Sequence, residues 1–163
     1  MLEERGGWFV VNVQDAQWKS NAAFGRRATF EAQGRFPQTG IRLAVLEPGK
    51  PNCRYHRENA QEDFLVLSGE CLLLVNGEER RLRAWDFVHC PPGVTHVFVG
   101  AGEGPATVLM IGHRPQNEEL CYPASELAGR YNAEAPETTP DPDVAYSDVP
   151  AWTDTDPPNW PKL

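Results

Sequence analysis

The feature that most constrains the fold is the regular alternation of short apolar segments and turn residues over the first 113 residues. Segments of four to six residues, rich in β-branched and aromatic side chains, recur at a spacing typical of an antiparallel sandwich or barrel. Asn76-Gly77 predicts a two-residue hairpin turn, because both positions favour positive φ. The expected strands are Trp8–Val13, Arg27–Ala32, Ile41–Leu46, Asp63–Leu67, Cys71–Val75, Glu79–Leu82, Phe87–Cys90, His96–Val99 and Thr107–Gly112. We therefore expect an all-β protein.

The last 50 residues differ from the rest in charge and proline content. Residues 114–163 contain 10 acidic and 3 basic residues and 9 of the 15 prolines, and so carry −7 of the net charge of −8. We expect a β domain at residues 1–113 and an extended, acidic, proline-rich C-terminal strap at residues 114–163. Aromatic residues such as Tyr122 and Trp152 would gain nothing in a solvated linker. The strap is therefore expected to be ordered by packing, within a homodimer.

Composition excludes several classes of function. The net charge of −8, without a cluster of Lys or Arg, argues against a nucleic-acid or membrane partner. No apolar run approaches the roughly 18 residues of a membrane span, and the N-terminus does not resemble a signal peptide. The four cysteines have no CxxC spacing, which argues against a structural zinc knot. We expect a cytoplasmic protein with reduced thiols and a small-molecule ligand.

Two strings in the segment richest in strands contain residue types that bind metals. The first ends with Glu62, six residues and Gly69, and the second reads Pro-Pro-Gly-Val-Thr-His and ends at His96. They resemble the two motifs of the cupin superfamily, of which the first ends in Glu-x6-Gly and the second contains Pro-x-Gly-x2-His. The resemblance covers residues 41–113. It implies a double-stranded β-helix, or jelly-roll barrel.

The sequence departs from the cupin pattern at important positions. The two histidine positions of the first motif hold Tyr55 and Arg57, with His56 between them. The opening glycine of the second motif is Trp85, which we expect in the core. A His-His-Glu-His ligand set therefore cannot be carried over unchanged.

Two registers would rebuild a metal site. In one, Glu58 replaces the second histidine. In the other, His56, Glu62 and His96 form a three-ligand site, with Glu58 as the candidate for a fourth ligand. This second register, which we favour, resembles 3-hydroxyanthranilate dioxygenases, cupins that bind iron through a His, a Glu six positions later and a distant His. Burying Glu62 without a partner would also be costly.

A set of two imidazoles and one carboxylate suits one divalent ion, Fe, Zn, Mn or Ni, and leaves up to three coordination positions open. With a divalent ion bound to two neutral imidazoles and one carboxylate, the site has a net charge of +1, which suits an anionic ligand. The resemblance implies a mononuclear metal oxygenase, of the dioxygenase kind, for a small organic substrate. The alternatives are a non-redox metal-dependent isomerase or lyase, and a cupin that binds a small ligand without catalysis. The substrate-clamping arginines of 3-hydroxyanthranilate dioxygenases fall on Asn52 and Gly100, so that substrate is not carried over.

Other residues are candidates for the pocket itself. Candidates for binding a substrate carboxylate are Arg42, Arg54 and Arg57. His89 and Cys90 are adjacent on one expected strand, so their side chains face opposite sides and one of them faces the cavity. Cys53 lies three residues before His56, where it would line the pocket mouth or be a buried thiol. The sequence leaves these assignments open.

Overall fold

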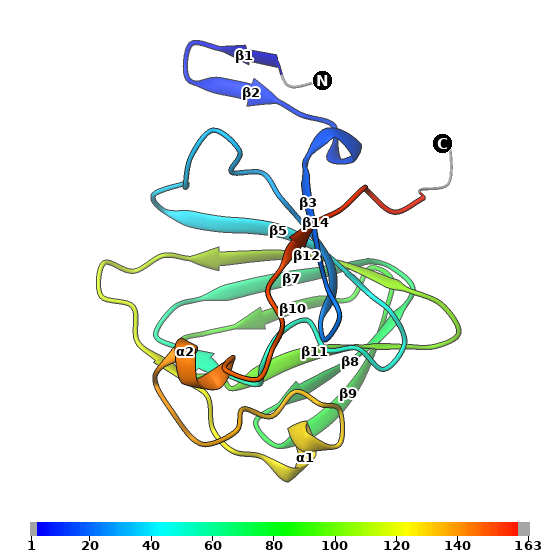
Figure 1. The fold of residues 1–163 in the computed structure, drawn as a ribbon, viewed down its shortest axis with the longest axis vertical. Helices are drawn as coiled ribbons and strands as arrows, with labels where there is room; N and C mark the ends of the chain where they lie inside the picture. Colours follow the sequence, from blue (N-terminus) through cyan, green and yellow to red (C-terminus); the bar gives the residue numbers. More distant parts are fainter. Residues whose placement is uncertain (1–2, 160–163) are drawn as a thin grey trace.

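Two β-sheets that pack face to face form the body of the computed structural model, which describes residues 3–159 (Figure 1). The first two residues of the expected β domain and the last four of the expected strap lie outside the described residues. The strands are β1 (Glu3–Arg5), β2 (Trp8–Val10), β3 (Gln17–Asn21), β4 (Gly25–Thr29), β5 (Thr39–Leu46), β6 (Arg57–Glu58), β7 (Glu62–Ser68), β8 (Glu70–Val75), β9 (Glu78–Arg83), β10 (Phe87–Cys90), β11 (His96–Ala101), β12 (Ala106–His113), β13 (Leu120–Cys121) and β14 (Thr153–Asp154). The short helices are α1 (Glu126–Gly129) and α2 (Pro142–Ala145).

The larger sheet has seven strands in the order β10-β7-β12-β5-β4-β3-β14, and the smaller has three in the order β11-β8-β9. A buried cluster between them joins residues of both sheets, such as Phe64 of β7 and Phe98 of β11, whose ring centroids lie 4.6 Å apart. On β5, Ala44 belongs to this inner cluster, whereas Leu43 packs on the outer face against Trp18 of β3. Both faces of β5 are therefore covered, as its apolar composition requires.

The all-β jelly-roll expectation is confirmed, and all nine expected strands are present, Phe87–Cys90 with the expected ends and the others with shifted ends. Strand β3 was not predicted, because its sequence Gln-Trp-Lys-Ser-Asn has one apolar side chain and reads as a loop. The expectation for Trp85 was wrong. Its side chain is 73% exposed, and its φ of +76° explains why glycine is favoured at this motif position.

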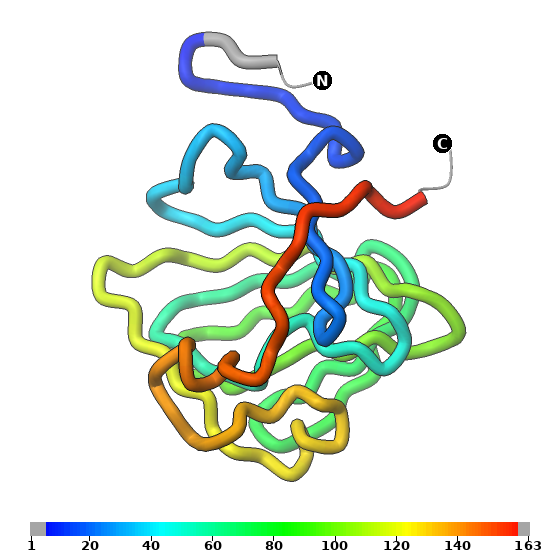
Figure 2. Tube along the Cα trace, viewed as in Figure 1, coloured from blue at the N-terminus to red at the C-terminus, as the bar shows by residue number. Residues whose placement is uncertain are grey.

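The described part of the strap packs against its own chain. Residues Tyr122, Ala128, Ala133 and Ala145 are buried in it. Figure 2 shows the path of the strap from the turns around α1, in yellow, through α2, in orange, to the red segment that ends beside the N-terminal strands. There β14 pairs antiparallel with β3 and forms the last strand of the larger sheet. Helix α1 begins after Ser125, whose side chain accepts a hydrogen bond from the backbone N–H of Ala128.

Candidate metal centre

His56 and His96 are held opposite each other by a short antiparallel bridge. The backbone N–H of His96 donates to the carbonyl of His56 at 2.8 Å, and the reverse bond measures 3.2 Å. Glu62 begins β7 in the larger sheet, whereas His96 begins β11 in the smaller one. The three side chains converge, and one ligand atom from each lies within 4.8 Å of the others.

Hydrogen bonds to the backbone fix the orientation of both imidazoles. The Nδ1–H of His56 donates to the carbonyl of Arg54 at 2.9 Å, and that of His96 donates to the carbonyl of Val94 at 3.0 Å. The Nε2 atoms therefore point at Glu62, whose Oε2 lies 3.9 Å from Nε2 of His56 and 3.0 Å from Nε2 of His96. Such backbone partners set the tautomer that presents Nε2 to a metal.

Burial and charge shift the pKa values of the three groups in different directions. Burial, assisted by the charge of His96, lowers the pKa of His56. Burial alone would also lower the pKa of His96, but hydrogen bonds with the Cys90 thiol and the Glu62 carboxylate raise it to about 10. Burial opposes the charged form of Glu62, yet the hydrogen bond and charge of His96 hold its pKa below the usual value. A cation entering this site would therefore displace a proton from His96.

Glu58 lies beside the cluster without belonging to it. Burial and the negative charge of Glu62 raise the pKa of Glu58 to about 8, and the two carboxyl groups share a hydrogen bond. Among residues 3–159, the group whose ligand atoms converge within 4.8 Å consists of His56, Glu62 and His96. The geometry therefore resembles the three-residue register more than the one that requires Glu58.

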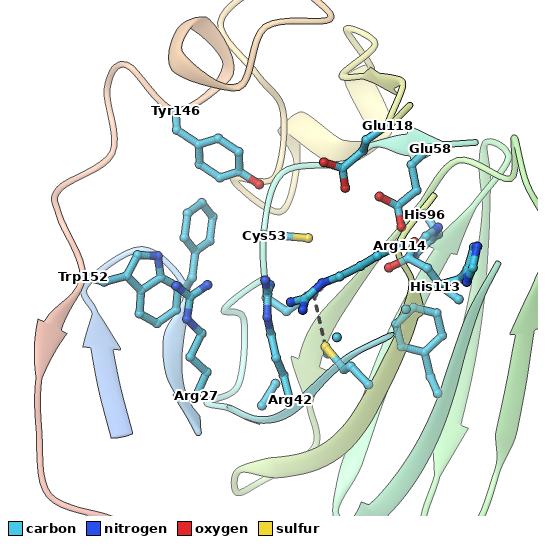
Figure 3. A pocket seen from close by; sticks show the side chains of 18 of the residues that line it. Arg27, Arg42, Cys53, Glu58, His96, His113, Arg114, Glu118, Tyr146 and Trp152 are labelled. Carbon is cyan, nitrogen blue, oxygen red and sulfur yellow. Dashed lines mark hydrogen bonds and ion pairs between the residues drawn. The ribbon is translucent and has the colours of Figure 1, made fainter. Parts of the chain in front are cut away.

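A cavity of about 380 Å³ opens beside the cluster. Carboxylates and an imidazole line one end of it, with Glu58 and Glu118 beside His96 (Figure 3) and Glu62 in contact with His96. Arg27 and Arg42 project into it from another side, and Figure 3 shows Trp152 of the strap next to Arg27. One cavity thus has an acidic end, with side chains that could hold a metal ion, and a basic end.

The three arginine candidates have different places. Arg42 lines this cavity, whereas Arg57 is exposed beside a separate shallow pocket. Arg54 is buried and bonded to the strap, which makes it a structural residue. Arg27 and Trp152 also line the cavity, but the sequence did not predict this. Arg27 follows Arg26 in a polar stretch of β4 that has no distinguishing pattern.

The remaining candidates also have defined places. Cys90 faces the barrel interior, whereas His89 is exposed and its Nδ1 lies 2.6 Å from Oδ1 of Asp63. Cys53 lines the cavity, its Sγ lies 3.7 Å from Nδ1 of His56, and burial raises its pKa to about 12. A thiol with so high a pKa is not a ready nucleophile or metal ligand.

Comparisons with known proteins support this architecture. The family model described as "Cupin domain" matches residues 42–112. A putative sugar phosphate isomerase from Acidithiobacillus ferrooxidans is 26% identical over 58% of this chain, with a TM-score of 0.53, and the chain spans 64% of its length. A sugar phosphate isomerase from Silicibacter pomeroyi is 22% identical (TM-score 0.61, 72% of this chain and 82% of that one). A predicted oxalate decarboxylase from Thermotoga maritima is 18% identical (TM-score 0.58, 65% and 99%).

No curated protein matches the sequence. Within residues 3–159 there is no helix whose length and apolar content would let it cross a membrane.

Proposed function

This chain belongs to the cupin superfamily, and from that premise we propose that it is a metalloenzyme acting on a small organic molecule. His56, Glu62 and His96 would hold one divalent ion at the acidic end of the cavity. The observation that carries the proposal is the convergence of two Nε2 atoms and one carboxylate within 4.8 Å.

The donor set fits a divalent cation. Both imidazoles have their Nδ1–H bonded to backbone carbonyls, so each presents Nε2 to the ion, and His96 gives up its Nε2 proton when the ion binds. Glu62 provides the negative charge that partly neutralises the ion. When bound, such an ion supplies Lewis acidity, and iron supplies redox chemistry as well. Around it, the buried Phe64 and the partly buried Met110 border the cavity and restrict water.

We propose oxygenation of the substrate as the reaction class, since three protein donors leave coordination positions for a substrate group and a second small molecule. A non-redox isomerisation or lyase reaction is the second candidate. It is supported by the two structures named as sugar phosphate isomerases and by the arginines at the other end of the cavity.

We also propose that the protein works in the cytoplasm as a homodimer. The four cysteines are free thiols, which suits a reducing compartment. The edge strand β10 and the turn before it expose Phe87 and Trp85, an apolar surface that a second copy could cover.

Metal stoichiometry tests the proposed site. Metal-free protein is loaded with Mn(II), Fe(II) or Zn(II) under anaerobic conditions, desalted, and analysed for bound metal. We expect one equivalent in the wild type and loss of stoichiometric binding in Glu62→Gln, which keeps the shape of the side chain but removes its charge. Glu58→Ala should stay within about tenfold of the wild-type affinity. Glu118→Gln, at an exposed carboxylate of the same cavity, is the matched control.

The outcomes separate the alternatives. Full metal content in Glu62→Gln would refute the site, and loss of metal in Glu58→Ala would add Glu58 to the ligands. Oxygen uptake by the Fe(II) form with phenols or thiols would support oxygenation. Anaerobic product formation with Zn(II) and small acids or phosphate esters would favour the isomerase or lyase. Melting shifts without any product would favour a binding protein.

A further inference from the structure

Arg27 and Arg42 project from the same face of the larger sheet. On β5, Arg42 is two residues before Ala44, which faces the barrel interior, so the two side chains share that face. On β4, Arg27 is paired directly with Ala44, and directly paired residues also share a face. The pairing register therefore directs both guanidinium groups into the cavity (Figure 3).

Two glycines lie between this basic end and the cluster of His56, Glu62 and His96. Gly112 of β12 is paired with Glu62 of β7 on one side and with Gly40 of β5 on the other. Arg42 lies two residues farther along β5 than Gly40, and β5 is two strands from β7. With strands about 4.8 Å apart, the strands that carry Arg42 and Glu62 are separated by roughly 10 Å. Glycine adds no side chain at these two positions, and the guanidinium group of Arg114, which is paired with Glu31, lies over Gly40. Both ends line the same cavity of about 380 Å³, so one small molecule can reach both.

Neither arginine is in a direct ion pair with any residue that the structure describes. Among residues 3–159, no ion pair and no hydrogen bond is formed by either side chain, and the buried Nε of Arg27 has no partner. Two nearby arginines differ sharply, because Arg114 is paired with Glu31 and Arg54 with Asp148. Leaving the partly buried Arg27 without a partner is costly unless a ligand neutralises it, and the exposed Arg42 on the same cavity wall can bind the same ligand.

The strap holds one of these cations in place. The guanidinium carbon of Arg27 lies 3.8 Å from the centroid of a Trp152 ring, and Trp152 is itself stacked on Phe24 at 6.4 Å. A guanidinium group stacked in this way is fixed in plane and can present two parallel N–H donors to an oxyanion. Trp152 is thus a positioning residue for Arg27.

We propose that Arg27 and Arg42 form an anion-binding subsite that clamps a carboxylate or phosphate group of the substrate. The reactive end of the same molecule would lie at His56, Glu62 and His96. The substrate is then a small organic acid or phosphate ester about as long as the gap between the two ends. The inference rests on the proposed function for the reactive end, but anion binding itself does not require the metal.

The test is a titration of the metal-free full-length protein with inorganic phosphate and with benzoate, at constant ionic strength, followed by calorimetry and by the melting temperature. At least one of the two anions should bind saturably to the wild type, and the anion that binds more tightly identifies the class of oxyanion. Arg27→Gln and Arg42→Gln should each weaken binding by about tenfold or more, since each loses a charged donor. Arg42→Lys, which keeps the charge but not the two parallel donors, should fall between wild type and Arg42→Gln. Arg83→Gln, an exposed arginine on β9, is the matched control.

Binding of neither anion to the wild type, or unchanged binding in both glutamine variants, would overturn the subsite. Metal content separates this failure from that of the proposed function. The two arginine variants should bind metal as the wild type does, whereas Glu62→Gln should lose metal and still bind the anion. Anion binding by a protein that never takes up metal would support the subsite and refute the metalloenzyme.

Discussion

Replacing Arg54 with alanine probes how the strap is attached to the barrel. Arg54 is 6% exposed, and its side chain reaches from the loop before β6 to the strap. Its Nε donates to the carbonyl of Ala145 at 3.1 Å, and its Nη1 donates to the carbonyl of Asn132 at 3.3 Å. Its Nη2 is paired with the carboxylate of Asp148. One guanidinium group therefore bonds three separate points of the strap.

The cost of the substitution follows from these partners. The two carbonyl groups lose bonds from a charged donor, each worth about 1.5–3 kcal/mol. The carboxylate of Asp148 is exposed and can be hydrated instead, so losing its ion pair with Arg54 adds little to the cost. We expect the free energy of unfolding to fall by roughly 3–6 kcal/mol. For a chain of this size, that corresponds to a melting temperature lower by roughly 6–24 °C.

Urea denaturation and thermal melting followed by circular dichroism measure this change, and limited proteolysis reports release of the strap. Arg57→Ala, three residues away and exposed, should change the free energy of unfolding by no more than about 0.5 kcal/mol. Arg54→Lys should fall between the two, because it keeps the charge without the three-way geometry. An Arg54→Ala protein as stable and as resistant to protease as Arg57→Ala would refute the reasoning.

Two further outcomes are expected. A hydrogen bond from Arg114 lowers the pKa of Glu31, so the stability from this pair is present above the unfolded-state pKa of about 4.5 and is lost as the pH falls through the lower folded-state pKa. Glu31→Gln should therefore be less stable than wild type in urea at pH 7, and the difference should shrink at acid pH; a constant difference would exclude the linkage. If β10 forms the homodimer interface, the double variant Trp85→Ser and Phe87→Ser should be monomeric by light scattering, and a monomeric wild type would contradict the proposal.

The strand pattern could be predicted because it depends on local chemistry. Apolar, β-branched segments between turn residues identify strands such as β5 and β12, whatever they pair with. Strand β3 could not be found in this way, since it is held by pairing with β4 and β14 and by its buried Trp18. Trp85 was misplaced for a related reason. Its apolar side chain suggests burial, but the turn fixes its backbone at positive φ and turns the indole outward.

The convergence of His56, Glu62 and His96 could also be predicted, because motif spacing defines where each residue lies relative to its strand. The basic end of the cavity could not. Whether Arg27 faces the cavity depends on its pairing with Ala44, and that register is set by packing rather than by the sequence near Arg27.

Arg54 also links the strap to the cluster of His56, Glu62 and His96. Its carbonyl accepts the Nδ1–H of His56, and its backbone N–H donates to the hydroxyl of Tyr146 in the strap at 3.2 Å. Ala145 and Asp148 hold the side chain of the same residue. Releasing the strap would free the peptide that orients the His56 ring, and lost orientation of a ligand typically costs about 10–100-fold in metal affinity. Arg54→Ala should therefore bind metal more weakly although its side chain is not a ligand, whereas unchanged affinity with a released strap would show that the barrel alone orients His56.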